Sequence, residues 1–191
     1  YPGLRVPGGW DNFEIAVRTI IGQQVSIQAA NTITGRLVRE YGTPIENSFI
    51  PGIAYLFPTP EALAAADLSA IGMPAKRART LNTLASKVAE GEITLEGIAD
   101  IESVKRDLLQ LPGIGKWTTE YIAMRALREP DAFPAGDLAL KRELQGMSSQ
   151  VPDDYQEINR PQVWRPWRAY AAMYLWKKHA TKNVKNQEVR I

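Results

Sequence analysis

The segment Leu-Pro-Gly-Ile-Gly, residues 111–115, constrains the fold of this chain most strongly, because helical patterns flank it on both sides. Residues 101–111 precede it and residues 116–128 follow it, and each stretch has the spacing of a helix. The two glycines permit a tight turn and a close approach of another backbone. The turn opens the second helix, whose first amides lack partners and carry partial positive charge. The segment therefore predicts a helical hairpin suited to one phosphate group, with a plain hairpin that binds nothing as the alternative.

Two nucleotide-binding motifs do not fit this turn. The P-loop needs Gly-x-x-x-x-Gly-Lys-Ser/Thr after a strand, whereas Trp117 follows Lys116 here and the preceding segment is helical. The dinucleotide motif needs a third glycine at the position of Thr118. A phosphate of a nucleic-acid backbone is therefore the ligand that the turn favours.

Helical patterns also cover most of the remaining chain. Helix starts are predicted where capping residues or prolines precede apolar residues at helical spacing, namely at Asp11, Ser26, Pro60, Asp67 and Pro74. Residues 43–60 are rich in turn formers and are expected to form a loop, and residues 151–161 to be irregular or partly helical. Residues 162–178 are expected to form one helix. No alternating β-branched run argues for a sheet, so the sequence predicts an all-α protein.

Composition removes several kinds of chemistry. The chain has no cysteine, which excludes disulfides, thiolate zinc sites and cysteine-ligated iron–sulfur clusters within it. Its one histidine, His179, is expected at the surface and makes a Ser-His-Asp triad improbable. No apolar run is long enough to span a membrane, and the first residues do not resemble a signal peptide. Because the chain lacks an initiator Met, we expect it to be a fragment or a trimmed protein.

Charge gathers near the C-terminus. Residues 160–191 hold eight Lys or Arg against one acid, Glu188, and aromatic residues lie among them. A basic surface with aromatic side chains suits nucleic acid. Charge alone favours the plainer interpretation of a solvated helix and tail.

Five segments resemble, in order, those of the helix-hairpin-helix DNA glycosylases, and most closely the 3-methyladenine DNA glycosylase II family. They are FEIAVRTIIGQQVSIQAA, LFPTPEALAAADLSAIGMPAKRARTL, LPGIGKWTTEYIAMRAL, PAGDLALKREL and WRPWRAYAAMYLW. The resemblance implies two helical lobes with a cleft between them. Residues 12–129 would carry the hairpin, and residues 1–11 with 130–191 would carry the catalytic Asp. Members often have an N-terminal β-rich domain, and this chain is expected to begin after it.

The resemblance implies base-excision repair by hydrolysis of the N-glycosidic bond of alkylated purines, such as 3-methyladenine and 7-methylguanine, in duplex DNA. Asp137 lies 24 residues after Gly113 and matches the essential carboxylate of the family. It would stabilise the oxocarbenium-like sugar and orient or deprotonate water. Without the hairpin, Asp137 is better explained as a helix N-cap, and the hairpin at the family's spacing favours the catalytic role instead. Trp117 stands where bifunctional relatives carry a Schiff-base lysine, so we expect no strand cleavage.

Further residues take roles by resemblance. The base pocket would be lined by aromatic side chains, those of Trp117, Tyr121 and Trp176. The residues expected to contact DNA lie in two turns and at a helix start, and they are Gln23, Gln24, Gly113, Gly115, Lys116 and Thr118. The hairpin is also expected to be able to hold Na⁺ or K⁺ through the main-chain carbonyls of Leu109, Leu111 and Ile114.

The same resemblance implies no required cofactor, duplex DNA with alkylated bases as the partner, and no membrane partner. We expect a monomer in the cytoplasm of a bacterial-type cell, at the nucleoid. A non-catalytic hairpin module that binds the DNA backbone is an alternative, although such a module has no use for a carboxylate at Asp137. The C-terminal part of a larger repair protein is another. An oxidised-base glycosylase and lyase is disfavoured by Trp117 and by the absence of cysteine.

Overall fold

The computed structural model describes residues 1–46, 50–97, 100–148 and 160–188. Within these ranges the chain is mostly helical, which confirms the predicted all-α class. The first half holds α1 (Asn12–Ile21), α2 (Ile27–Tyr41), β1 (Thr43–Pro44), β2 (Tyr55–Leu56), α3 (Pro60–Ala64), the 3-10 helix η1 (Leu68–Ile71) and α4 (Ala75–Ala89). The second half holds α5 (Ile101–Gln110), α6 (Lys116–Arg125), α7 (Leu138–Ser148), α8 (Arg160–Val163) and α9 (Arg168–Glu188).

The predicted helix starts are confirmed, and at three of them the predicted residue caps the helix with its side chain. The Asp11 carboxylate accepts from the backbone amides of Phe13 and Glu14 at 2.8 and 3.1 Å. Ser26 and Asp67 cap α2 and η1 in the same way, and Pro60 occupies the first turn of α3. These caps pair amide groups that the first turn of a helix leaves without partners.

Some predicted boundaries are wrong. The single helix expected over residues 162–178 is instead α8 and α9, separated by a turn that contains Pro166, because proline has no amide proton and its ring clashes with a continuing helix. The loop expected over residues 43–60 contains a short antiparallel pair of strands, with Thr43 opposite Leu56. Helix α6 ends at Arg125, before a left-handed Arg128 with φ of 59°. Residues 149–159, which include most of the stretch expected to be irregular, lie outside the described residues.

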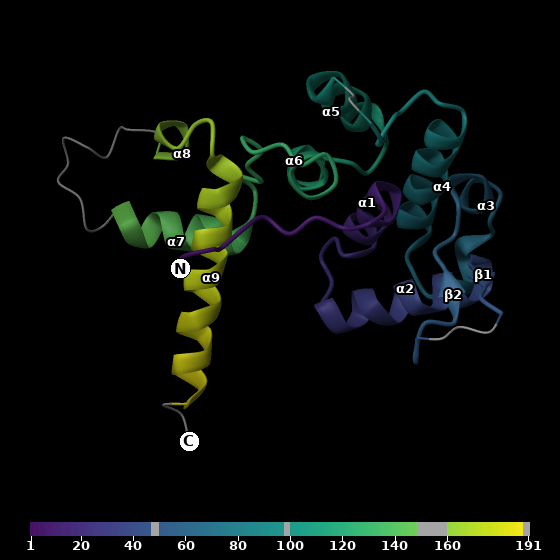
Figure 1. The fold of residues 1–191 in the computed structure, drawn as a ribbon, viewed down its shortest axis with the longest axis horizontal. Helices are drawn as coiled ribbons and strands as arrows, with labels where there is room; N and C mark the ends of the chain where they lie inside the picture. The colour runs from purple at the N-terminus through teal and green to yellow at the C-terminus, as the bar shows by residue number, and fades with distance from the viewer. Residues whose placement is uncertain (47–49, 98–99, 149–159, 189–191) are drawn as a thin grey trace.

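Two hydrophobic clusters form the core. The first is built from α1 to α6 and includes the fully buried Ile20, Leu37, Leu81 and Leu84. The second is smaller and joins α6 to the residues around α7 and α9, through Ala123, Met124, Phe133, Leu140, Ala169, Ala172 and Leu175. Figure 1 shows α1 to α4 on one side and α7 to α9 on the other, with α6 between them. Helix α6 therefore belongs to both clusters.

The N-terminal segment crosses between these two groups of helices (Figure 1). At one end, the Tyr174 hydroxyl donates to the Tyr1 carbonyl at 3.0 Å, which places the segment on α9. Further along, Arg125 Nε donates to the Pro7 carbonyl at 2.6 Å. Among the helices of the described residues, none is both long and apolar enough to cross a membrane.

Candidate active site and DNA interface

The Asp137 carboxylate lies at the centre of the candidate active site. Its Oδ1 accepts from the amides of Ala139 and Leu140 at 2.9 and 3.0 Å, so Asp137 caps the start of α7. The same Oδ1 accepts from Trp176 Nε1 at 3.0 Å, and Oδ2 accepts from Trp117 Nε1 at 3.3 Å. The Asp137 carboxylate is therefore both the cap of α7 and the centre of the candidate site. Oδ2 has only the longer of these bonds and has capacity to accept another proton donor, such as water.

The three aromatic residues predicted for a base pocket come together around this carboxylate. The rings of Trp117 and Tyr121 stack with centroids 5.1 Å apart, and Trp176 is tilted against Tyr121 at 6.0 Å. Trp117 and Tyr121 are one helical turn apart on α6, whereas Trp176 comes from α9. The structure thus brings together residues that the sequence grouped only by resemblance.

Arg125 completes the aromatic group, and the sequence analysis did not identify it. Its guanidinium carbon lies 5.5 Å from the Tyr121 ring centroid, and Nη1 donates to the Tyr121 hydroxyl at 3.0 Å. The signal was present, since Arg125 follows Tyr121 by four residues on the same helix face. Arg125 therefore fixes the Tyr121 ring and leaves the hydroxyl proton free to point elsewhere.

A cleft of about 510 Å³ lies beside this aromatic group. Helix α6 contributes Trp117, Tyr121 and Arg125 to its lining, while Arg18 and Asn31 come from α1 and α2. The exposed apolar residue Ile27 also lines it. The site thus has a hollow next to its rings, with basic and polar groups on the walls.

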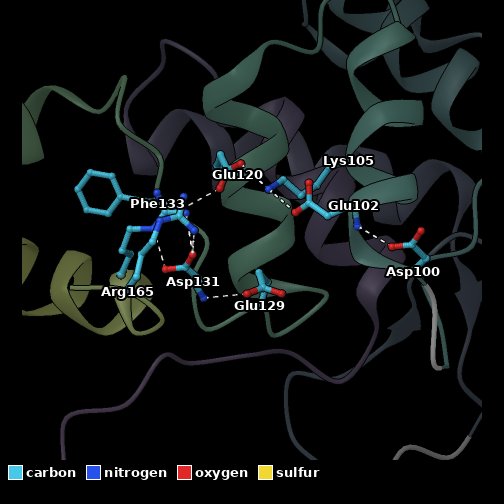
Figure 2. A network of polar contacts seen from close by, with 9 residues as sticks. Asp100, Glu102, Lys105, Glu120, Glu129, Asp131, Phe133 and Arg165 are labelled. Carbon is cyan, nitrogen blue, oxygen red and sulfur yellow. Dashed lines mark hydrogen bonds and ion pairs between the residues drawn. The ribbon is translucent and has the colours of Figure 1, made fainter. Parts of the chain in front are cut away.

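The loop that leads to Asp137 is held from both sides, as Figure 2 shows. On the α6 side, Glu120 Oε2 accepts from the Phe133 amide at 2.9 Å, while Glu120 Oε1 pairs with Lys105 at 2.8 Å. On the other side, Asp131 accepts two hydrogen bonds from Arg168, at 2.7 and 2.9 Å, and pairs with Arg165. Asp137 is therefore presented by a loop with little freedom.

Lys105 is the half-buried end of this network. Burial alone would lower the pKa of its ammonium group, but hydrogen bonds to Glu120 and Glu102 outweigh burial and raise the pKa. Lys105 therefore stays charged at neutral pH and keeps Glu120 oriented toward the loop.

The hairpin has the geometry that its sequence predicts. Gly113 has φ of +89°, a left-handed conformation, and a Cβ atom there would lie 2.3 Å from Thr80 Oγ1. Gly115 begins α6 without a side-chain cap, and a Cβ there would meet nothing within 4 Å. Lys116 is exposed beside it. The first amides of α6 therefore have no side-chain cap, which is the arrangement that a phosphate site at a helix start needs.

Of the other residues predicted to contact DNA, one side chain faces outward and two face inward. Gln24 is exposed in the turn between α1 and α2, with a left-handed φ of 55°. Gln23 instead donates to Thr118 Oγ1 at 2.9 Å, and Thr118 is only 4% exposed. The side chains of Gln23 and Thr118 thus face each other within the protein.

The carbonyls proposed for a monovalent cation belong to residues of different exposure. The Leu109 side chain is exposed, while Leu111 and Ile114 are buried, and the Leu111 carbonyl accepts from the Ile114 amide at 3.1 Å. Across the described ranges, no group of three or more His, Asp or Glu side chains is placed to hold a metal ion.

A known protein family matches the part of the chain that carries this site. The family model of the HhH-GPD superfamily of base excision DNA repair proteins matches residues 17–169. The chain belongs to this superfamily. The matched residues include the hairpin, the aromatic residues Trp117 and Tyr121, and Asp137. Membership confirms the superfamily that the sequence segments resemble.

Individual relatives are similar over nearly the whole chain. DNA-3-methyladenine glycosylase 2 of Escherichia coli is 40% identical over 178 residues, which cover 92% of this chain and 60% of that protein. A probable bifunctional transcriptional activator and DNA repair enzyme AlkA of Mycobacterium tuberculosis is also 40% identical, over 92% of this chain and 35% of that protein. The chain thus spans between about a third and three fifths of the length of these curated relatives.

A solved relative has DNA in its structure. The 3-methyladenine DNA glycosylase of Schizosaccharomyces pombe, in complex with abasic DNA, is 27% identical, with a TM-score of 0.64. The alignment covers 93% of this chain and 84% of that one. The glycosylase fold of this superfamily therefore extends over the helices that carry the candidate site.

A second ionic group, which the sequence did not predict, is centred on Glu143. Glu143 on α7 is 3% exposed and accepts from Lys182 at 2.8 Å, and its Oε1 lies 3.2 Å from His179 Nδ1. His179 is therefore half-buried beside Glu143, and it lies at the surface only in part. Burial alone would raise the pKa of Glu143, but hydrogen bonds from Lys182 and His179, with the charges of Lys182 and Lys178, lower it overall.

Proposed function

We propose that this chain is a DNA glycosylase that hydrolyses the N-glycosidic bond of alkylated purines, such as 3-methyladenine and 7-methylguanine, in duplex DNA. The observation that carries the proposal is the Asp137 carboxylate, which accepts N–H groups from Trp117 and Trp176. An anion among aromatic rings offers both groups that this reaction needs, one for the developing sugar cation and one for a cationic base. Similarity to a relative named DNA-3-methyladenine glycosylase 2 supports the substrate class.

The reaction follows from the charge of the damaged base. Methylation at N3 or N7 makes the purine cationic, so the C1′–N bond breaks with its electron pair moving to the base, which leaves as a neutral molecule. The sugar becomes oxocarbenium-like, and the Asp137 carboxylate stabilises it. Water attacks C1′, and its proton passes to Oδ2 of Asp137, which leaves an abasic site. Because the leaving base is already activated, the proposed reaction uses no cofactor.

Base recognition rests on the aromatic group. An electron-rich ring attracts a desolvated cation by about 1–2 kcal/mol, which favours methylated over ordinary purines. Arg125 already lies 5.5 Å from the Tyr121 centroid. We therefore assign the stacking face to Trp117 or Trp176, with Tyr121 as their support.

The proposed reaction stops at base release. Trp117 occupies the helix position where a bifunctional relative would need a lysine to attack the sugar. Lys116 is one residue earlier, about 100° away around the helix, and is exposed. We assign Lys116 to a DNA phosphate and expect no Schiff base and no strand cleavage.

DNA binding is assigned to the two turns near the site. The amides at Gly113, Gly115 and Lys116 would hold a backbone phosphate, and Gln24 would fill the gap left by the extruded base. The carbonyls of Leu109, Leu111 and Ile114 would hold a Na⁺ or K⁺ ion next to that phosphate. Binding of this kind weakens steeply with salt.

The proposal extends to the organisation of the chain. Residues 12–129 would act as the hairpin lobe, and residues 1–11 with 130–191 as the lobe that carries Asp137. The two hydrophobic clusters support a division of this kind, although α6 contributes to both. The protein would act as a monomer on alkylated duplex DNA in the cytoplasm of a bacterial-type cell.

Base release from methylated duplex DNA tests the proposal directly. We expect the wild-type chain to release N-methylpurines, Asp137→Asn to lose about 10²–10⁴-fold in rate, and strand breaks to appear only after alkali. Asp107→Asn, an exposed carboxylate on α5, is the matched control and should keep the wild-type rate. Breaks without alkali would contradict the monofunctional assignment.

A non-catalytic hairpin module is the second candidate. The start of α6, which has no side-chain cap, favours it as much as it favours an enzyme. It predicts salt-sensitive duplex binding with no release of base, and an Asp137→Asn variant that binds DNA at least as tightly as the wild type.

A further inference from the structure

The side chain of Gln23 joins the two turns assigned to DNA. Its Nε2 donates to the Gly113 carbonyl in the hairpin at 3.2 Å and to Thr118 Oγ1 at 2.9 Å. Thr118 lies in the first turn of α6 and is almost fully buried. A side chain held by two acceptors is not available to enter a duplex. Its neighbour Gln24, exposed at the tip of the turn, is available.

Both turns also rest on one face of α4. Arg77 Nη2 donates to the Gln23 carbonyl at 2.6 Å, which fixes the backbone just before the left-handed Gln24. Thr80 Oγ1 donates to the Pro112 carbonyl at 2.8 Å. Arg77 and Thr80 are three residues apart on a helix and therefore share a face. The turn over residues 22–26 and the hairpin are thus fastened to a single rigid support.

Two details show how closely this support is fitted. The left-handed Gly113 leaves no space for a Cβ atom beside Thr80 Oγ1, which a Cβ would approach to 2.3 Å. Arg77 Nε is buried, and no hydrogen-bond partner for it exists among the described residues. An unpaired buried N–H group is unfavourable, so packing alone would favour an apolar residue here. The bond to the Gln23 carbonyl gives the guanidinium a specific use.

We propose that Gln23, Arg77, Thr80 and Thr118 form a brace that fixes the base-extruding turn relative to the phosphate-binding hairpin. These four are positioning residues, because they act through Gln24 and the hairpin amides and do not touch the reacting atoms. The inference rests on the proposed function. It replaces the expectation that the side chains of Gln23 and Thr118 contact DNA themselves.

The brace has a direct mechanical consequence. Extrusion of a stacked base requires a filler to hold the gap open while the backbone is gripped nearby. If the hairpin holds a phosphate, the brace keeps Gln24 at a set position relative to that grip. A loosened brace should therefore impair extrusion of a well-paired base more than binding to DNA that already lacks the base.

The test uses Gln23→Leu, which keeps side-chain volume and removes both hydrogen bonds, and Thr118→Val, which removes only one acceptor. Gln145→Leu on the exposed face of α7 is the matched control. Hydrogen exchange without DNA is measured over residues 22–27 and 113–118. Single-turnover release of 7-methylguanine is measured in two duplexes, one fully paired and one with a baseless tetrahydrofuran residue opposite the damaged base. Affinity for an abasic duplex is measured as well.

We expect Gln23→Leu to speed exchange in both turns, to slow release from the paired duplex about tenfold, and to slow release opposite the gap much less. Thr118→Val should also speed exchange in both turns and should slow release from the paired duplex a few-fold. For both variants, affinity for abasic DNA should change little. Exchange that rises only in residues 22–27, or equal losses on both duplexes, would overturn the brace. If the wild type releases no base, the proposed function fails, whereas coupled exchange would still establish the brace.

Discussion

The two hydrophobic clusters are built by different means. The first is aliphatic and large, and fully buried leucines and isoleucines from separate helices fill it. The second is small and depends on neighbours that carry charge. Asp131 pairs with Arg165 and Arg168 on one flank of it, and the buried Glu143 pairs with Lys182 on the other.

The difference bears on how the site is divided. The hairpin and the brace rest on α4, which is packed in the first cluster, and on α6, which contributes to both clusters. Asp137 and Trp176 belong to the segments around the second cluster, whose placement depends on ion pairs. Burial of aliphatic surface is insensitive to pH, whereas ion pairs are not. The hairpin proposed to bind phosphate should therefore be the more robust half of the site. The half that carries Asp137, the proposed catalytic residue, should be the more sensitive to solution conditions.

The largest effect on stability should come from the first cluster. Leu84 is fully buried on α4, so Leu84→Ala should lower the free energy of unfolding by about 2–5 kcal/mol through lost burial and a cavity. Urea unfolding at pH 7 and pH 5 should give the same loss. Leu109→Ala, at a leucine that is 41% exposed, is the control and should cost about 0.5 kcal/mol or less. If the loss of stability in Leu84→Ala depended strongly on pH, the first cluster would not differ from the second in its sensitivity to pH.

A smaller, pH-dependent effect is expected from the second cluster. Glu143→Gln keeps the shape and removes the charge, and should cost about 2 kcal/mol at pH 7. The folded pKa of Glu143 lies below its ordinary value of 4.5, so its contribution is complete above pH 4.5 and is lost as pH falls through the folded value. The difference between variant and wild type in urea unfolding should therefore shrink in acid.

An exposed ion pair provides the control for that experiment. Glu102 pairs with Lys105 at 2.9 Å but its side chain is 69% exposed, so Glu102→Gln should change the free energy of unfolding by about 0.5 kcal/mol or less. Equal effects of the two substitutions would show that burial of Glu143 adds nothing.

The sequence was a good guide to the first cluster and a poorer one to the second. Helices α1, α2 and α4 follow from apolar spacing and from local caps such as Asp11, which need only neighbouring residues. Gly113 also followed from local chemistry, because only glycine suits that turn. Such features lie within a few residues of their cause.

The remaining features depend on partners far apart in the chain. The bond from Gln23 to Gly113 spans 90 residues, and that from His179 to Glu143 spans 36. Helical spacing does not fix the register between α7 and α9, so no pattern could pair these two residues. The break between α8 and α9 is different, since Pro166 lies in the sequence at the break and a proline interrupts a continuing helix.

The smallest predicted effect compares the two indoles that meet at Asp137, one from each side of the site. Trp176→Phe and Trp117→Phe each keep an aromatic ring and remove one N–H donor. The Trp176 bond is 3.0 Å and the Trp117 bond is 3.3 Å, so we expect base release to slow about tenfold for Trp176→Phe and less for Trp117→Phe.

Single-turnover release separates this effect from substrate binding. If both indoles act mainly by orienting the carboxylate, the maximal rate should fall while affinity for abasic duplex stays constant. Trp164→Phe is the control, because Trp164 packs against Phe133 in the second cluster and no bond from it to Asp137 is seen among the described residues. A larger loss for Trp117 than for Trp176 would mean that the ring of Trp117, on α6, holds the base. Helix α6 would then supply base recognition as well as the proposed phosphate site.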